Sequence, residues 1–222
     1  MKKPNTDAIR FAGDDLLSVA IDDSDACQQL AAHLRVNGEW IEAVAGISSC
    51  VVQFDNTRLD ADGARRRLEQ AIESAPETAA GDPGEIELPV CYGGEFGPDL
   101  EAVCATLGVD PERFIALHTG GEHRVELIGF TPGFAYVGGF DTAAEVSRLA
   151  EPRLRVEVGS IGIAGGRSGV YALAGPGGWP LVGRTPVKLF DPQAEDPFRL
   201  RHGLRVRFRA IERQEYDQIS TA

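Results

Sequence analysis

The sequence predicts an α+β protein, with a small α/β domain and linker over residues 1–84 and a β-barrel or β-sandwich domain over residues 85–222. Three observations favour this division. Strand-like and helix-like segments alternate in the first part. The stretch 75–84 is rich in Pro, Ala and Gly, which is typical of a linker. Beyond it, 19 of the 26 glycines lie within residues 93–183, among short apolar runs that indicate closely spaced strands.

The first domain is expected to have the element order β-β-α-β-β-α. The expected elements are two strands within residues 8–21, a helix over 24–36 capped by Ser24 or Asp25, strands over 40–45 and 48–54, and a helix that follows Asp60. Apolar side chains at helical spacing and a Ser or Asp at each start predict the two helices. Gly46 separates the second pair of strands, as in a hairpin.

The second domain is expected to begin with a strand and two short helices and to continue as an all-β unit. The first strand should cover residues 85–91, the helices 99–107 and 111–118, and the later strands 125–128, 161–164, 170–173, 181–182, 187–190 and 204–208. Several short strands at close spacing predict a barrel or a sandwich. In the last strand three arginines alternate with apolar residues, which predicts an apolar inner face and a basic outer face.

Composition limits the function classes. The chain has 22 basic and 34 acidic residues and a formal net charge of −12, which disfavours binding to nucleic acid or an anionic membrane surface through charge alone. No apolar run approaches the ~18 residues that span a bilayer, and no apolar signal segment follows the start. We therefore expect a cytoplasmic protein. The four histidines lack metal-ligand spacing, so no metal site is expected.

The first unusual segment, residues 129–139, reads GFTPGFAYVGG. It places three aromatic residues around a Pro-Gly pair, namely Phe130, Phe134 and Tyr136 around Pro132 and Gly133. The Pro-Gly pair predicts a type II turn, because proline fixes φ at the first corner and glycine accepts a positive φ at the second. Two interpretations stay open here: a rigid loop that presents aromatic side chains to a ligand or partner, and an aromatic corner of the barrel.

The second segment, residues 159–169, is rich in glycine. It matches neither G-x-G-x-x-G nor G-x-x-x-x-G-K-[ST], so it does not predict a phosphate-binding loop. Its glycines allow the backbone to approach another surface closely. The residues of interest in it are Ser160, Gly165, Gly166, Arg167 and Ser168. A guanidinium and a hydroxyl side by side suit a carboxylate or a phosphate.

The third segment, residues 175–186, holds Trp179 between Gly-Gly and Pro and carries Arg184 shortly after. The interpretations are a functional tryptophan and arginine, or a core tryptophan beside a surface arginine. All three segments carry glycine with aromatic or arginine side chains, so we expect them to form one functional cleft at or near a partner interface.

Together the segments resemble the KipI/PxpB family, also called allophanate hydrolase subunit 1. Its members show G-F-x-P-G-F-x-Y-x-G-G, P-R-x-x-V-x-x-G-S-x-G-I-A-G-G and P-G-G-W-x-x-x-G-R-T-P, which match residues 129–139, 152–166 and 176–186 in that order. Residues 88–100 and the Leu117-His118 pair also look like family positions. The resemblance implies a ferredoxin-like N-terminal domain and a cyclophilin-like β-barrel after it.

The resemblance also implies a function. The chain would be a subunit of an ATP-dependent 5-oxoprolinase, working with a larger KipA/PxpC-like subunit and a third, PxpA-like lactam-hydrolase protein. Since the chain has no Walker motif, ATP and its Mg²⁺ are expected to bind with or on the partner subunit. His118 matches a family position and is a candidate general acid or base, the alternative being a cap at the end of its helix.

Two other functions remain open at this point. One is a regulator that inhibits a sensor histidine kinase, as in one member of the family. The other is a lobe of a carboxyltransferase that acts on urea or allophanate. That second role needs biotin, and the sequence contains no biotinyl-lysine context.

Overall fold

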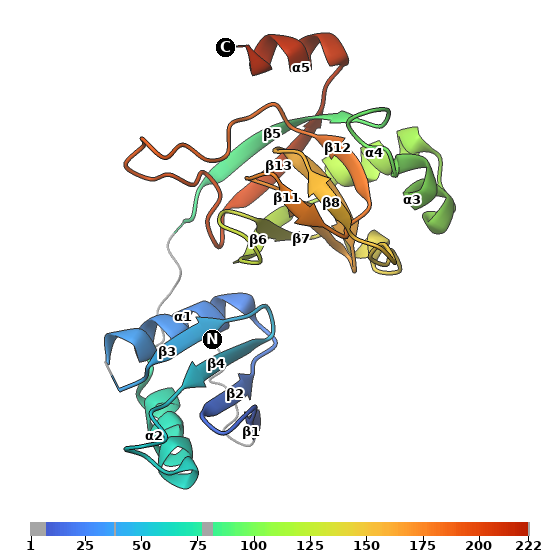
Figure 1. The fold of residues 1–222 in the computed structure, drawn as a ribbon. Helices are drawn as coiled ribbons and strands as arrows, with labels where there is room; N and C mark the ends of the chain where they lie inside the picture. The colour runs from blue at the N-terminus through green and yellow to red at the C-terminus, as the bar shows by residue number, and fades with distance from the viewer. Residues whose placement is uncertain (1–7, 38, 77–81, 222) are drawn as a thin grey trace. The chain divides into compact units, whose positions relative to one another are not determined.

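The computed structural model describes residues 8–37, 39–76 and 82–221. The chain forms two compact units, one ending at Asp82 and the other beginning at Pro83 (Figure 1). Residues 77–81 of the expected linker lie outside the described residues, and the predicted domain boundary after residue 84 stays a prediction. No helix in the described ranges is both long and apolar enough to cross a bilayer.

The small unit has the predicted order β-β-α-β-β-α. Its elements are β1 (Ile9–Phe11), β2 (Leu16–Ala20), α1 (Ser24–Val36), β3 (Glu42–Ala45), β4 (Ser49–Gln53) and α2 (Ala61–Ser74). The sheet order is β1-β2-β4-β3, with all neighbours antiparallel. Helix α1 joins β2 to β3 while β4 lies between them, which is a split β-α-β arrangement. This arrangement supports the ferredoxin-like assignment, which stays a prediction.

The helices of the small unit begin where carboxylates accept their first backbone N–H groups. Asp23 caps α1 by accepting from Ala26 N–H at 3.0 Å, one residue before the predicted Ser24. Asp60 caps α2 by accepting from Gly63 N–H at 2.7 Å, as predicted. Each cap satisfies a donor that the first turn leaves free. The helices then bury their apolar faces against one side of the sheet.

The second unit is a closed barrel of seven strands in the order β10-β7-β6-β13-β5-β12-β9. The strands of the unit are β5 (Glu85–Tyr92), β6 (His123–Ile128), β7 (Ala135–Gly138), β8 (Arg153–Val156), β9 (Ser160–Ala164), β10 (Arg167–Val170), β11 (Gly175–Gly177), β12 (Leu181–Arg184) and β13 (Arg205–Ala210). Strands β8 and β11 form a separate two-stranded sheet. The helices are α3 (Leu100–Leu107), α4 (Pro111–Gly120) and α5 (Arg213–Ser220), with a short 3₁₀ helix, η2, at Asp141–Ala143. A cyclophilin-like classification stays a prediction.

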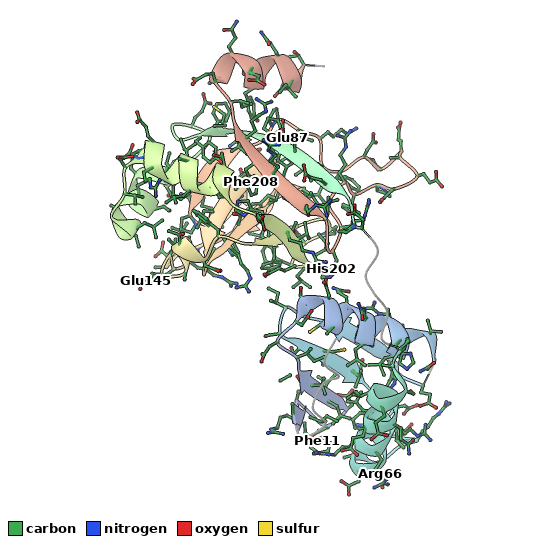
Figure 2. The ribbon with its side chains drawn as sticks, turned by 180° about the vertical axis from the view of Figure 1, so that it is seen from behind. Phe11, Arg66, Glu87, Glu145, His202 and Phe208 are labelled. Carbon is green, nitrogen blue, oxygen red and sulfur yellow. The ribbon has the colours of Figure 1, made fainter. Side chains whose placement is uncertain are left out.

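Strand β13 follows the predicted alternation. Val206 and Phe208 are buried inside the barrel, while Arg205, Arg207 and Arg209 alternate with them and face outward. Phe208 is labelled on this strand in Figure 2. Because β13 pairs parallel with β5 over Arg205–Ala210 and Glu85–Val90, strands from the two ends of the unit lie side by side.

Five elements were not predicted, namely β7, β8, β11, η2 and α5. One predicted strand is absent, and the strand predicted over 170–173 lies instead at Arg167–Val170. Strands β7, β8 and β11 have only three or four residues each, too few to show a period of two. Helix α5 has only two apolar side chains, Tyr216 and Ile219, which are too few to predict a helix from its sequence. The predicted strand over 187–190 is wrong, because that run forms an isolated bridge between Phe190 and Phe198 in place of a ladder.

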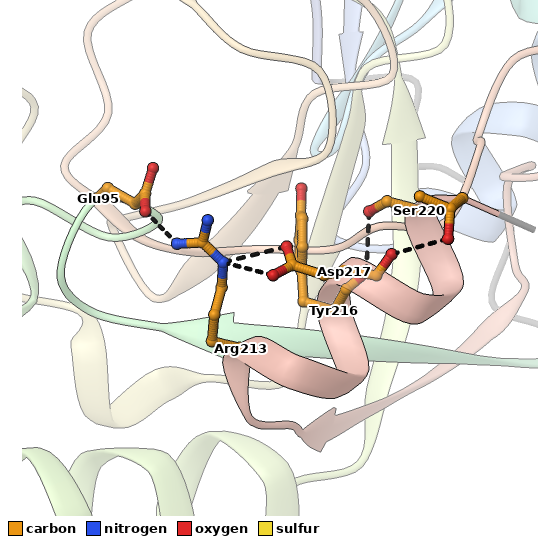
Figure 3. A network of polar contacts seen from close by, with 6 residues as sticks. Glu95, Arg213, Tyr216, Asp217 and Ser220 are labelled. Atoms are coloured by element: carbon orange, nitrogen blue, oxygen red, sulfur yellow. Dashed lines mark hydrogen bonds and ion pairs between the residues drawn. The ribbon is translucent and has the colours of Figure 1, made fainter.

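Helix α5 is attached to the barrel by a small side-chain network. Arg213 pairs with Asp217 one turn along the helix and with Glu95 on the loop after β5 (Figure 3). Beside it, the rings of Phe96 and Tyr216 lie 4.4 Å apart. These exposed ion pairs contribute little to stability, so the ring contact is the main attachment.

Candidate functional site

The turn in the first aromatic segment has the predicted form. Phe134 donates its backbone N–H to Thr131 O at 3.0 Å, and Gly133 has a φ of 73°. These are the hydrogen bond and the positive φ of a type II turn. Phe130, just before it, also has a positive φ, 71°, and its side chain is 62% exposed. A non-glycine residue held in this region is strained, and such strain concentrates at functional sites.

The strand that follows points successive side chains to opposite sides of the barrel wall. Ala135 and Val137 face the barrel core, so Tyr136 faces outward. On this outer face Phe134, Tyr136, Tyr171 and Trp179 gather in a second, smaller cluster. The Phe134 ring lies 4.8 Å from Tyr171 and 4.9 Å from Tyr136, both edge to face. Edge-to-face packing fixes the rings against one another.

Two glycines of the second segment make room for these rings. Gly162 and Gly169 are paired across β9 and β10. A Cβ at Gly169 would lie 2.7 Å from Phe134 Cζ and 2.9 Å from Trp179 Cε3, and one at Gly162 would lie 2.7 Å from Trp179 Cβ. The rings therefore rest directly on the backbone of the barrel wall. Close ring packing explains these two glycines without a bound phosphate.

A pocket of about 320 Å³ opens beside the aromatic cluster, with a volume in the range of small-molecule sites. Its lining residues are Phe130, Tyr136, Arg148, Leu149, Pro152, Tyr171, Pro176, Gly177, Gly178 and Trp179. Three of these, Phe130, Tyr136 and Trp179, are among the predicted site residues. Phe134 supports them as a buried ring in contact with all three. The exposed Pro132 and the buried Gly133 form the turn before Phe134.

Sequence reasoning missed Arg148 and Tyr171. Both lie next to the matched segments, since Arg148 is four residues before Pro152 and Tyr171 directly follows β10. Burial raises the pKa of Tyr171, so its hydroxyl remains protonated at neutral pH. The guanidinium carbon of Arg148 lies 6.0 Å from the centroid of the Trp179 ring.

His118 lies inside the barrel and does not line the pocket. It is fully buried, with Nδ1 2.6 Å from the Tyr92 hydroxyl and Nε2 2.8 Å from the Ser168 hydroxyl. Its ring stacks on Phe208 at 4.2 Å. Burial, and secondarily His123, holds the pKa of His118 well below the ordinary 6.5, so the imidazole is neutral at neutral pH.

A histidine beside a serine hydroxyl is a pattern of nucleophilic catalysis. Here Ser168 is itself fully buried, and neither side chain is among the residues that line the pocket. The Tyr92–His118–Ser168 chain satisfies the polar groups of the barrel interior, which is sufficient reason for its presence. A catalytic role for His118 stays a prediction.

The structure places the other predicted residues away from the pocket lining. Arg167 forms a salt bridge with Glu126 at 2.7 Å, and its guanidinium also donates to Gly165 O. Gly165 and Gly166 have positive φ values at the turn between β9 and β10. Arg184 pairs in register with Ser160, and its guanidinium lies 5.6 Å from the Phe96 ring centroid. The predicted residues thus divide among the pocket, the barrel interior and two neighbouring surfaces.

The class of protein is shown by a family model that matches most of the chain. The family model described as "Carboxyltransferase domain, subdomain C and D" matches residues 8–200. The urea carboxylase of Kluyveromyces lactis has the same fold, with a TM-score of 0.76 over 96% of this chain and 22% of that chain at 17% identity.

Closer relatives give the particular family. The chain is 42% identical to a 5-oxoprolinase subunit from Bacillus subtilis, over 80% of this chain and 78% of the relative. It is also 42% identical to the protein of the same name from Escherichia coli O157:H7, over 81% and 82%. The crystal structure of TTHA0988 matches 89% of this chain and 40% of that longer chain, at 32% identity and a TM-score of 0.71. The chain belongs to this family of 5-oxoprolinase subunits, the KipI/PxpB family that its motifs resemble.

Proposed function

We propose that the protein is a subunit of an ATP-dependent 5-oxoprolinase that opens the lactam of 5-oxoproline to glutamate. The names of the relatives support this activity, and the word "subunit" in those names supports a multi-protein enzyme. The partners are a larger KipA/PxpC-like subunit and a third, PxpA-like lactam-hydrolase protein. TTHA0988, in which a region similar to this chain makes up 40% of one longer chain, fits such an association.

The pocket on the outer face of the barrel is this chain's part of the substrate site. One observation carries the proposal: segments far apart in the sequence bring Phe130, Tyr136 and Trp179 to the wall of one pocket of about 320 Å³. Aromatic walls suit a small planar ring, and a few polar groups then fix its orientation.

The chemistry explains the need for ATP. A lactam is a resonance-stabilised amide and a poor electrophile. Transfer of the γ-phosphoryl group from ATP to the carbonyl oxygen of the lactam releases ADP and makes the carbonyl carbon reactive toward water. Water adds to this carbon and the carbon–nitrogen bond breaks, which leaves the free amine and an acyl phosphate. A second water then hydrolyses the acyl phosphate to the glutamate carboxylate and inorganic phosphate. The contribution of this chain is to hold the lactam in a fixed position and limit its exposure to water.

ATP and its Mg²⁺ bind with or on the larger subunit in this proposal. The sequence has no Walker motif, and the glycine turn between β9 and β10 lies beside an arginine that is already ion-paired. The proposed setting is the cytoplasm, where ATP is available.

Co-purification with the larger subunit, followed by an assay of 5-oxoproline-dependent ATP hydrolysis with the third protein present, tests the proposal. We expect hydrolysis by the assembly and none by this chain alone. Strong 5-oxoproline-stimulated hydrolysis by the single chain would refute the shared site. An assembly that shows no response to 5-oxoproline, or a chain that binds a sensor histidine kinase instead, would refute the function.

A further inference from the structure

The outer-face pocket has one charged side chain among its lining residues, that of Arg148. The rest of the lining is aromatic, aliphatic, proline or glycine. The Arg148 guanidinium lies beside Trp179, 6.0 Å from the ring centroid. Arg148 is exposed, so its guanidinium is accessible to an anion in the pocket while one side of it lies near the Trp179 ring.

Arg148 has no ionic partner within the described residues. Arg153 and Arg167, in the same unit, pair with Asp99 and Glu126 at 2.8 and 2.7 Å. Arg148 makes its ring contact with Trp179 and no salt bridge with any carboxylate in the part of the chain that the structure describes. A guanidinium that its own chain leaves unpaired is available to a ligand anion, and its planar fork matches a carboxylate.

A second polar group at the pocket wall also lacks a partner. The Tyr171 hydroxyl is buried against Gly177 and lies near the Trp179 backbone, without a hydrogen bond of normal geometry. Burial raises the pKa of Tyr171, so this hydroxyl is a donor. This oxygen is shielded from solvent, so it is part of the pocket wall and Arg148 is the exposed polar group available to a ligand.

We propose that Arg148 binds the carboxylate of the lactam substrate and sets the preference of the site for acidic lactams over neutral ones. The inference rests on the proposed function, because it assigns the carboxylate of 5-oxoproline to this side chain. Arg148 acts here as a substrate-binding residue. The bond breaking at the ring does not pass through it.

The test compares an acid with its neutral analogue in the assembled enzyme. Arg148→Ala should raise the KM for 5-oxoproline roughly ten- to hundredfold and leave kcat within about threefold, because the carboxylate contact is the same in ground and transition states. The carboxamide analogue has the same ring and no charge. Its inhibition constant against 5-oxoproline should stay within about twofold in the variant, since no charged contact is lost.

Two variants control the test. Arg113→Ala removes an exposed arginine on α4 and should leave both constants unchanged. Arg148→Lys keeps the charge without the fork and should restore part of the affinity. An unchanged KM in Arg148→Ala overturns the inference while the proposed function stands, and so does an equal loss of acid and carboxamide binding. A wild-type assembly that does not respond to 5-oxoproline overturns both.

Discussion

The two sides of one barrel wall differ in chemistry although they share the same strands. On the inner side of β7 and β10, Val137 and Ser168 face the core, and Ser168 completes the chain of hydrogen bonds around His118. On the outer side, Tyr136 and Gly169 face the aromatic cluster. Because side chains alternate along a strand, adjacent residues of one motif contribute to a closed core that contains a buried hydrogen-bond chain and to an open aromatic site.

Residues of a motif that forms a strand must therefore be grouped by the side of the strand on which their side chains lie before roles are assigned to them. Arg167 and Ser168 are neighbours in sequence, yet one is paired on the outer surface and the other is buried inside. A substitution on the inner side should therefore act on stability, and one on the outer side on ligand binding.

The largest effect is expected on the inner side. His118→Ala removes a fully buried ring and leaves the hydroxyls of Tyr92 and Ser168 without their partner. We expect a loss of about 3–5 kcal/mol in the free energy of unfolding, since a cavity and unsatisfied groups add. Chemical denaturation checks this, with His33→Ala, on a helix surface, as the control. A variant of wild-type stability that has lost only kcat would show instead that His118 is catalytic.

The second-largest change in stability is expected on the outer side of the barrel wall. Gly169→Ala places a Cβ against Phe134 and Trp179, so the rings must move. We expect a loss of about 1–3 kcal/mol in stability, as for overpacking, together with weaker binding of 5-oxoproline. Gly175→Ala is the matched control, because nothing lies within 4 Å of its added Cβ. Equal behaviour of the two variants would mean that the rings do not need a glycine beneath them.

The pH dependence of stability sharpens the comparison. The pKa of His118 is well below 6.5 in the folded state, so below that pH the unfolded chain binds a proton that the folded chain does not. Above the pKa of His118 in the unfolded chain, the buried neutral imidazole costs no stability. As the pH falls below that pKa, the free energy of unfolding decreases by about 1.4 kcal/mol per pH unit. His118→Gln should lose this slope. Denaturation at several pH values measures it, and parallel curves for the two proteins would contradict the buried neutral imidazole.

The smallest effect on stability is expected at Phe130. Glycine adopts the φ of 71° without strain, so Phe130→Gly should change stability by less than about 1 kcal/mol. Binding should weaken, because the exposed ring is part of the pocket lining. Thermal unfolding and the KM for 5-oxoproline check both parts. Full affinity in the variant would remove Phe130 from the site.

The sequence predicted what depends on local patterns. Both helices of the small unit, the Pro132-Gly133 turn and the alternation in β13 follow from caps, turn chemistry and periodicity. The sequence did not predict on which face of the barrel wall the side chains around β7 lie, because Phe134 and Tyr136 were interpreted as residues of a loop. The pairing of Arg167 with Glu126 comes from a contact across 41 residues, which no local pattern contains. Arg148 was missed for the same reason, as only the fold brings it to Trp179.

The parallel contact between β5 and β13 has a consequence for synthesis on the ribosome. Strand β5 at Glu85–Tyr92 is made early, but its neighbour at Arg205–Ala210 emerges more than a hundred residues later. The barrel cannot close until then, whereas the small unit contains all its own strands within the first part of the chain. Until β13 is made, the apolar side chains of the barrel interior stay exposed, which is the condition under which partly made chains are prone to aggregate.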